Sequence, residues 1–218
     1  HAALQVLVVI HLVQTAMLLP GIWAMVPMRL FKAVVVGAAV GSPIGLLFFM
    51  GASQEDRTLY ANLAPALFIL PYFLFSATAG QIAEKYEKAA LIRVTTAMEI
   101  GIMSLAAVGF VMGWPALLLV VLFLTGLQST LFGPVKYSIL PQVLKPEELT
   151  GGNGLIEMIT SISILLGMIT GIVLLMNADS GPMYAAAAVI ALAVLGHLVS
   201  RAIPRAPAGA PDLKVSWI

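Results

Sequence analysis

Cysteine is absent from this 218-residue chain, and charged residues make up only 10% of it. Without cysteine there is no disulfide, thiol nucleophile or thiolate metal site. A soluble domain carries about 25% charged residues, so this chain cannot build a surface that faces water on all sides. The net charge of +1 argues against the basic face that nucleic-acid binding requires. The three histidines are scattered without metal-ligand spacing, so we predict no catalytic residue, no metal site and no cofactor.

Hydrophobic residues, in contrast, make up 61% of the chain, and the mean hydropathy is +1.03. A helix needs about 20 apolar residues to span the hydrocarbon core of a membrane. Apolar runs of roughly this length lie at 4–26, 30–50, 61–82, 92–112, 115–135, 154–176 and 183–200. These runs are continuous and do not alternate with polar residues, which favours helices over barrel strands. The sequence therefore predicts an all-α membrane protein.

Turn signals and charge clusters separate the predicted spans. They lie at 54–57, 84–88, 112–115, 145–152 and 177–182. After Arg201 the chain becomes rich in proline and alanine, which predicts an exposed linker rather than another span. We therefore divide the chain into a hydrophobic N-terminal segment at 1–28, a six-helix unit at 29–203 and the start of a cytoplasmic linker at 204–218.

Positive charge is distributed unequally between the two sets of loops. If the spans alternate in direction, Arg57 stands alone on one side. The other side holds Lys85, Lys88, Arg93, Lys136, Lys145, Arg201, Arg205 and Lys214. Lysine and arginine concentrate in cytoplasmic loops, so we expect 83–91, 136–152 and the tail after 200 to be cytoplasmic. The loops at 51–60, 113–114 and 177–182 then face outward.

The first fifty residues allow two interpretations. If 30–50 is a span, Arg29 and Lys32 lie at its cytoplasmic end, and 4–26 is an additional hydrophobic helix. Alternatively, one helix runs from about 18 to 42 and carries both charges into the membrane. We favour the first interpretation, because a charge at the centre of a membrane helix costs about 2.5–3.5 kcal/mol on insertion scales.

Two carboxylates, Glu99 and Glu157, fall within predicted spans, where ionisable groups normally face the bundle interior or a water-filled cavity. For Glu157 the alternative is an interfacial residue favoured by the helix dipole. Polar residues also share one face of the 115–135 span, with Gln128 and Ser129 on it and Lys136 beyond its end. Such a face predicts either a wet cavity or hydrogen bonds to neighbouring helices. We also expect Pro134 to interrupt this helix just before Lys136.

The segment at 80–88 (GQIAEKYEK) resembles the loop between the second and third helices of the major facilitator superfamily. In that loop the glycine permits close helix contact, and an acid and bases form a charge latch that biases inward against outward states. The matching positions are Gly80, Glu84, Lys85, Lys88 and Arg93. The second glycine usual in that loop is Glu87 here.

Three further stretches resemble the lysophospholipid transporter family of that superfamily. They are 127–141 (LQSTLFGPVKYSILP), 144–149 (LKPEEL) and 151–157 (GGNGLIE), and the tail at 203–214 is similar to the start of that family's central cytoplasmic loop. The resemblance implies an N-terminal six-helix half of a transporter, whose C-terminal half would follow. Residues 30–32 (LFK) fit the stretch that this family carries in its first helix, but residues 27–29 (PMR) replace its polar triplet, and the loss of the acid puts ion coupling in doubt.

The same resemblance implies lysophospholipid movement across the bacterial inner membrane to feed re-acylation, in relatives often with a fused acyltransferase. Lys136 matches a lysine of the family, and Glu157 matches a carboxylate. We predict substrate contacts at Lys136, Gln128, Glu157, Glu99 and Ser129. The alternative function is that of a facilitator-superfamily porter for another small solute or drug.

Overall fold

The computed structural model describes residues 53–175 and 180–216 of the chain. Within them lie α3 (Gln54–Lys85), α4 (Lys88–Val111), α5 (Pro115–Ser138), the short α6 (Leu140–Val143), the 3-10 turn η1 (Pro146–Glu148), α7 (Leu149–Leu175) and α8 (Gly181–Ser200). The described residues contain no strand, and five of their helices are long and apolar enough to span a membrane. These findings confirm the predicted all-α membrane protein. The expectations for residues 1–50 lie outside the described residues.

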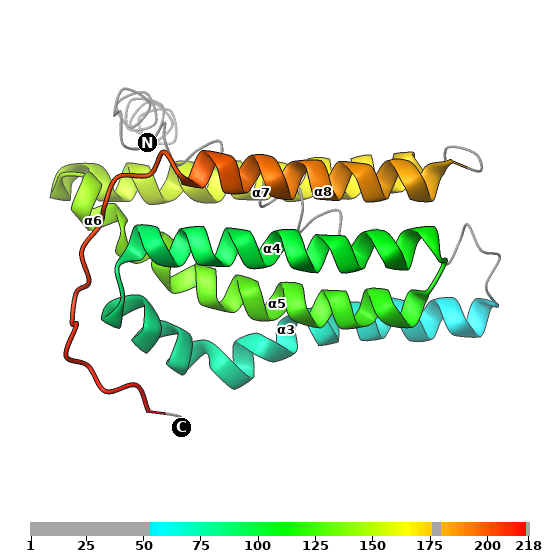
Figure 1. Cartoon of the computed structure of the whole chain (residues 1–218), viewed down its shortest axis with the longest axis horizontal. Coiled ribbons are helices and arrows are strands. Elements are labelled where there is room, and N and C mark those ends of the chain that lie inside the picture. The colour runs from blue at the N-terminus through cyan, green and yellow to red at the C-terminus, as the bar shows by residue number, and fades with distance from the viewer. Residues whose placement is uncertain (1–52, 176–179, 217–218) are drawn as a thin grey trace, which may run out of the picture.

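The charged segment at 54–57 is helical, and the prediction that it forms a loop is wrong. α3 begins at Gln54, because the Ser53 hydroxyl accepts a hydrogen bond from the Asp56 N–H at 3.1 Å and caps the helix. Glu55 and Asp56 then lie in the first turn, where the helix dipole favours negative charge. Pro65 and Pro71 lie inside α3, and Figure 1 shows that this helix is bent.

Two other boundaries differ from the prediction. α7 begins at Leu149, so the polar link expected at 145–152 is shorter than predicted. α5 continues through Pro134 to Ser138, so the predicted interruption before Lys136 is wrong. Membrane helices tolerate proline where neighbouring groups satisfy the freed backbone carbonyl. The tight reversal at 112–115 is confirmed, with Gly113 at a φ of 57° and Pro115 opening α5.

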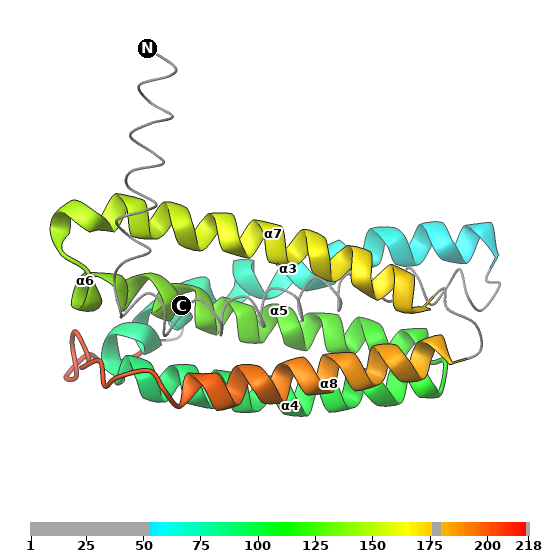
Figure 2. The ribbon, with the colours of Figure 1, turned by 90° about the horizontal axis from the view of Figure 1, so that it is seen from above.

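The helices alternate in direction, as the charge distribution predicts. In Figure 1 the α3–α4 turn, α6 and the tail after α8 lie at one end of the bundle. The start of α3 and the α4–α5 turn lie at the other end. We call the first end the cytoplasmic end, because most of the lysines and arginines belong to it. Figure 2 shows α7 along one side of the bundle and α4 with α8 along the other.

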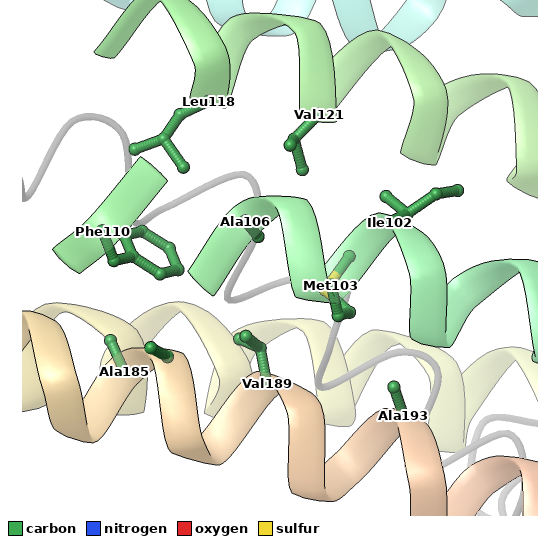
Figure 3. Packing of buried hydrophobic residues seen from close by; sticks show 10 residues of the cluster. Ile102, Met103, Ala106, Phe110, Leu118, Val121, Ala185, Val189 and Ala193 are labelled. Carbon is green, nitrogen blue, oxygen red and sulfur yellow. The ribbon is translucent and has the colours of Figure 1, made fainter. Parts of the chain in front are cut away.

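Small residues bring α4 and α8 together. Ala106 on α4 and Ala185 and Ala193 on α8 are buried in one hydrophobic cluster with Met103 and Phe110 (Figure 3). Leu118 and Val121 of α5 complete this cluster from the other side of α4. Because lipid tails are as apolar as leucine, close packing of small residues contributes more to helix association than hydrophobic burial does.

Candidate functional site

A buried polar group joins the middle of α5 to α4. Gln128 is 1% exposed, and its Nε2 donates to the Thr95 carbonyl at 2.9 Å and to Glu99 Oε2 at 3.5 Å. Glu99 and Ser129 are buried beside it. The polar face of α5 therefore meets a neighbouring helix, which was one of its two predicted interpretations. Thr95 belongs to the same group, although its sequence position did not single it out.

A second polar contact joins α4 to α8. Thr96 Oγ1 lies 3.1 Å from His197 Nδ1 and 3.2 Å from Ser200 Oγ. The Ser200 hydroxyl also donates to the His197 carbonyl at 2.6 Å. These bonds tie the cytoplasmic half of α8 to α4, next to the group around Gln128. Unsatisfied polar groups are costly in a membrane interior, so both contacts fix helix positions.

A third polar group lies at the cytoplasmic end of α5 and connects it to α7. Lys136 Nζ lies 2.6 Å from Glu157 Oε1, and the Tyr137 hydroxyl donates to the same carboxylate oxygen. Lys136 Nζ also lies 4.7 Å from the centroid of the Tyr137 ring. The lysine side chain is only 13% exposed, whereas that of Glu157 is 52% exposed. The Glu157 carboxylate therefore covers the side of the sheltered Lys136 ammonium group that would otherwise face solvent.

Four of the five predicted substrate contacts form two separate pairs. Gln128 and Glu99 are buried together between α4 and α5, whereas Lys136 and Glu157 form the pair between α5 and α7. Ser129 is buried next to Gln128 in the sequence of α5. At 1.5 Å of rise per residue, Gln128 and Lys136 are about 12 Å apart along α5. Tyr137 was not predicted as a site residue, although it stands beside Lys136 in the stretch that carries the family resemblance.

The loop residues predicted to gate transport lie where α3 meets α4. Lys88 is 2% exposed, and its Nζ donates to the Pro207 carbonyl at 3.3 Å. Arg93 pairs with Glu87 at 3.5 Å. Glu84 accepts a hydrogen bond at its backbone carbonyl from the Ala210 N–H. A side chain at Gly80 would meet no atom within 4 Å in the described part of the chain, so no close helix contact occurs there.

Glu87, which occupies the place of the usual second glycine, makes more contacts than the predicted gating residues. Its carboxylate accepts hydrogen bonds from the N–H groups of Ala89 and Ala90 at the start of α4 and of Ala206 in the tail. Partial burial raises the pKa of the Glu87 carboxyl, but these three donors and Arg93 outweigh burial, and the pKa is lowered overall. The sequence signal that could have pointed to Glu87 was its occurrence at the place of the usual second glycine.

The described residues contain no cluster of three or more histidine, aspartate or glutamate side chains that could hold a metal ion. The polar groups above instead link membrane-spanning helices, with charge at the cytoplasmic end. The family model of the major facilitator superfamily matches residues 31–216. The chain belongs to the major facilitator superfamily.

Among curated proteins, this superfamily member is similar to bacterial lysophospholipid transporters. It is 28% identical to the lysophospholipid transporter of Serratia proteamaculans over 186 residues, which cover 78% of this chain and 44% of that protein. It is 30% identical to the lysophospholipid transporters of Salmonella newport and Salmonella heidelberg over 141 residues, or 58% of this chain and 34% of each relative. The chain therefore spans less than half the length of these relatives.

The superfamily match extends further toward the N-terminus than the resemblance found in the sequence. It begins at residue 31, whereas the resemblance in the sequence begins at about residue 60. No solved structure matches the chain. As a member of this superfamily with five membrane-spanning helices among its described residues, the protein is a multi-pass membrane protein of a transporter family.

Proposed function

We propose that this chain is half of a transporter that moves lysophospholipid across the bacterial inner membrane, supplying it for re-acylation. The single observation that carries this proposal is the sheltered ammonium of Lys136, covered by the more exposed carboxylate of Glu157. The names of the curated relatives supply the lipid class. A C-terminal half and a fused or associated acyltransferase are the further partners that this proposal includes.

Lys136 is placed to recognise the phosphate of the substrate. A lysine ammonium is a compact point charge that binds phosphate oxygens well. Glu157 now occupies the position that a phosphate would take, and the Tyr137 hydroxyl donates to it. An arriving phosphate would replace one anion by another on Lys136 and Tyr137, so the ammonium stays paired throughout. Glu157 is the partner that moves, because its side chain is the more exposed of the two.

Glu99, Gln128 and Ser129 remain part of the proposal as contacts deeper in the bundle. In this conformation all three side chains, which belong to α4 and α5, are buried. Substrate would reach them only after these helices separate, as alternating access between two transporter halves provides. The proposal therefore orders the contacts: Lys136 meets the headgroup first, at the cytoplasmic end, and the buried group follows.

The proposal predicts that Lys136→Ala reduces uptake of a labelled lysophospholipid by vesicles that contain the native protein. A hydrogen bond to a charged group contributes about 1.5–3 kcal/mol, so we expect at least roughly a tenfold loss. Lys145→Ala is the matched control, since Lys145 is an exposed lysine at the same end of the bundle. Protein in the membrane fraction is quantified for every variant, so that loss of insertion is recognised.

The alternative function, transport of another small solute or drug, has its own outcome. If the native protein inserts but moves no lysophospholipid, the lipid proposal is wrong and other solutes become the substrates to test. If lysophospholipid uptake is normal in Lys136→Ala, the lipid assignment stands and Lys136 leaves the site. The two results separate the substrate class from the residue that recognises it.

A further inference from the structure

The segment after α8 makes an extensive contact that the transport proposal does not use. Residues 203–216, here called the strap, follow the end of α8 and contain no helix. Figure 1 shows the strap in red, running from α8 across the cytoplasmic end of the bundle. The sequence predicted an exposed linker from 204 onward. Ala206 and the preceding Ile203 are nevertheless buried, which shows that the strap begins as a packed segment.

The first part of the strap is anchored by both packing and hydrogen bonds. Ile203 and Ala206 are buried in a cluster with Ala83, Ala89, Ile92, Phe132, Val135 and Ile139. The Ala206 N–H donates to Glu87 Oε1 at 2.8 Å, and the Ala206 carbonyl accepts from the Lys88 N–H at 2.9 Å. Hydrogen bonds to a charged acceptor are about twice as strong as neutral ones. Glu87 is therefore the strongest single attachment of this part.

Pro207 adds a third attachment. Its carbonyl accepts hydrogen bonds from Lys88 Nζ at 3.3 Å and from Gln142 Nε2 at 3.1 Å. A buried ammonium is costly unless it is hydrogen-bonded, and Pro207 supplies that acceptor for Lys88. Lys88, which was predicted to belong to a charge latch, is thus hydrogen-bonded to the strap.

The second part of the strap is held differently. The Ala210 N–H donates to the Glu84 carbonyl at 2.9 Å, and Ser216 exchanges two backbone-to-side-chain hydrogen bonds with Gln81, at 2.7 and 3.3 Å. Within the described chain, every residue from 207 to 216 is exposed or half-buried. This part therefore has no buried apolar residue and depends on a few solvated hydrogen bonds, each of which contributes little.

We propose that the strap is a clasp with two separable parts, in which Glu87 docks residues 203–207 and Gln81 holds residues 208–216. The first part ties the end of α8 to the α3–α4 turn. The second part detaches and rebinds without releasing the first. A glycine at position 87 could not supply the docking carboxylate, so the clasp depends on this departure from the usual loop pattern. It also fixes the place beside α3 from which the chain leaves the bundle.

The experiment is limited trypsin digestion of the native protein in inside-out membrane vesicles. The strap contains two exposed cleavage sites, Arg205 in the first part and Lys214 in the second, and neither is followed by proline. Cleavage of a transiently opened segment follows the population of the open form. Cleavage rates at the two sites therefore report separately on the two parts.

We expect Glu87→Ala to accelerate cleavage after Arg205 by about tenfold, because it removes a charge-assisted hydrogen bond. Cleavage after Lys214 should change by less than about twofold, since Gln81 rather than Glu87 holds the second part. Gln81→Ala should accelerate cleavage after Lys214 and change cleavage after Arg205 by less than about twofold. Glu147→Ala is the matched control, because Glu147 is an exposed acid at the same end of the bundle whose side chain makes no hydrogen bond or ion pair with the strap in the described chain.

Glu87 also caps α4, so a second variant disturbs the docking from the side of the strap. Ala206→Leu enlarges a side chain buried in the apolar cluster, which cannot accept the added volume unless residues 203–207 move. Ala208→Leu, at a half-buried neighbour, is the control, and trypsin can still cleave after Arg205 in both variants. Ala206→Leu should expose the Arg205 site, and Ala208→Leu should not. Unchanged protection of this site in Ala206→Leu would overturn the proposal. Simultaneous release of both sites by Gln81→Ala would also overturn it, because the strap would then be one unit.

Discussion

The middle of α5 and its cytoplasmic end contain similar residues but make opposite kinds of contact. Each has a glycine followed by polar side chains. A Cβ at Gly126 would lie 2.2 Å from the Phe68 carbonyl oxygen of α3, whereas a Cβ at Gly133 would meet none of the described residues within 4 Å. Gln128 bonds to the backbone of α4, whereas Lys136 bonds to the half-exposed carboxylate of Glu157.

This difference separates contacts that fix the bundle from contacts that can exchange. Gly126 and Gln128 both contact the backbone of a neighbouring helix. A backbone atom cannot rotate away as a side chain can, so these contacts hold the helices in fixed positions. A lysine bonded to a mobile carboxylate can change partner at little cost, since another anion satisfies it equally well. We therefore expect substitutions in the middle of α5 to reduce stability, and substitutions at its end to change binding.

The largest expected effect is that of Gly126→Ala. The added methyl group would lie within 3.2 Å of three backbone atoms of Phe68, which cannot rotate away, so α3 must shift as a unit. Overpacking of this kind costs about 1–3 kcal/mol and occasionally more, and we expect a value near the top of this range. The apparent melting temperature of the native protein in detergent measures the effect.

Gly133→Ala is the matched control on the same helix. No atom of the described part of the chain lies within 4 Å of the added methyl group, and alanine forms helices better than glycine by about 0.5–1 kcal/mol. The melting temperature should stay constant or rise. Equal losses in both variants would contradict the distinction between the two regions of α5.

Gln128→Leu should produce the second-largest loss of stability. The change removes the donor to the Thr95 carbonyl and to Glu99, and it leaves buried acceptors without that partner. An unsatisfied buried group costs about 1–3 kcal/mol. Gln54→Leu, which changes an exposed glutamine in the first turn of α3, is the control and should shift the melting temperature by little. A Gln128→Leu protein as stable as this control would mean that the buried contact contributes nothing.

The contacts in the middle of α5 were only partly predictable from the sequence. The polar face with Gln128 and Ser129 was recognisable, because residues three or four apart share a side of a helix. Its partner was not, since nothing in a single helix shows which neighbour it packs against. Gly126 was not predicted at all, because a glycine in an apolar run has the same local signature whether or not a backbone lies against it.

At the cytoplasmic end, the helices and the positive charge were predicted, but several boundaries were wrong. Capping by Glu87 extended α4 into a segment whose charges suggested a loop, and at the opposite end of the bundle capping by Ser53 did the same for α3. Lys136 and Glu157 were each predicted from the family resemblance, whereas their direct contact depends on how α7 folds back past α6. The docking of the strap joins residues more than a hundred positions apart, a relation that no local pattern contains.

Glu157→Gln should have a small effect on stability, because exposed ion pairs contribute about 0–1 kcal/mol. The substitution should instead change the binding of lysophospholipid. The neutral amide holds Lys136 less firmly, so phosphate-containing lipid competes with a weaker partner and its apparent affinity should rise by a few-fold. The measurement is the concentration dependence of lysophospholipid uptake, with Glu147→Gln as the control at an exposed acid of the same end. A weakened affinity would show that Glu157 helps to bind the substrate rather than competing with it.

The smallest expected effect is a loosening of the strap in acid. The pKa of Glu87 is lowered in the folded protein, so its hydrogen bonds stabilise the strap fully above the ordinary glutamate pKa of about 4.3. This contribution is lost as the pH falls through the lowered value. Glu84 is another carboxyl group close to the strap, and Asp212 lies within the second part of the strap. A fluorescent label on Arg205→Cys, at an exposed residue of the first part of the strap, reports the mobility of that part. Mobility should stay constant from pH 8 to about 5 and increase only below about pH 4.

Glu87→Gln should make the label mobile at every pH, whereas Glu84→Gln should leave the transition in place. If the transition disappears with Glu84→Gln, the acid sensitivity comes from Glu84 rather than from Glu87, and the prediction is wrong.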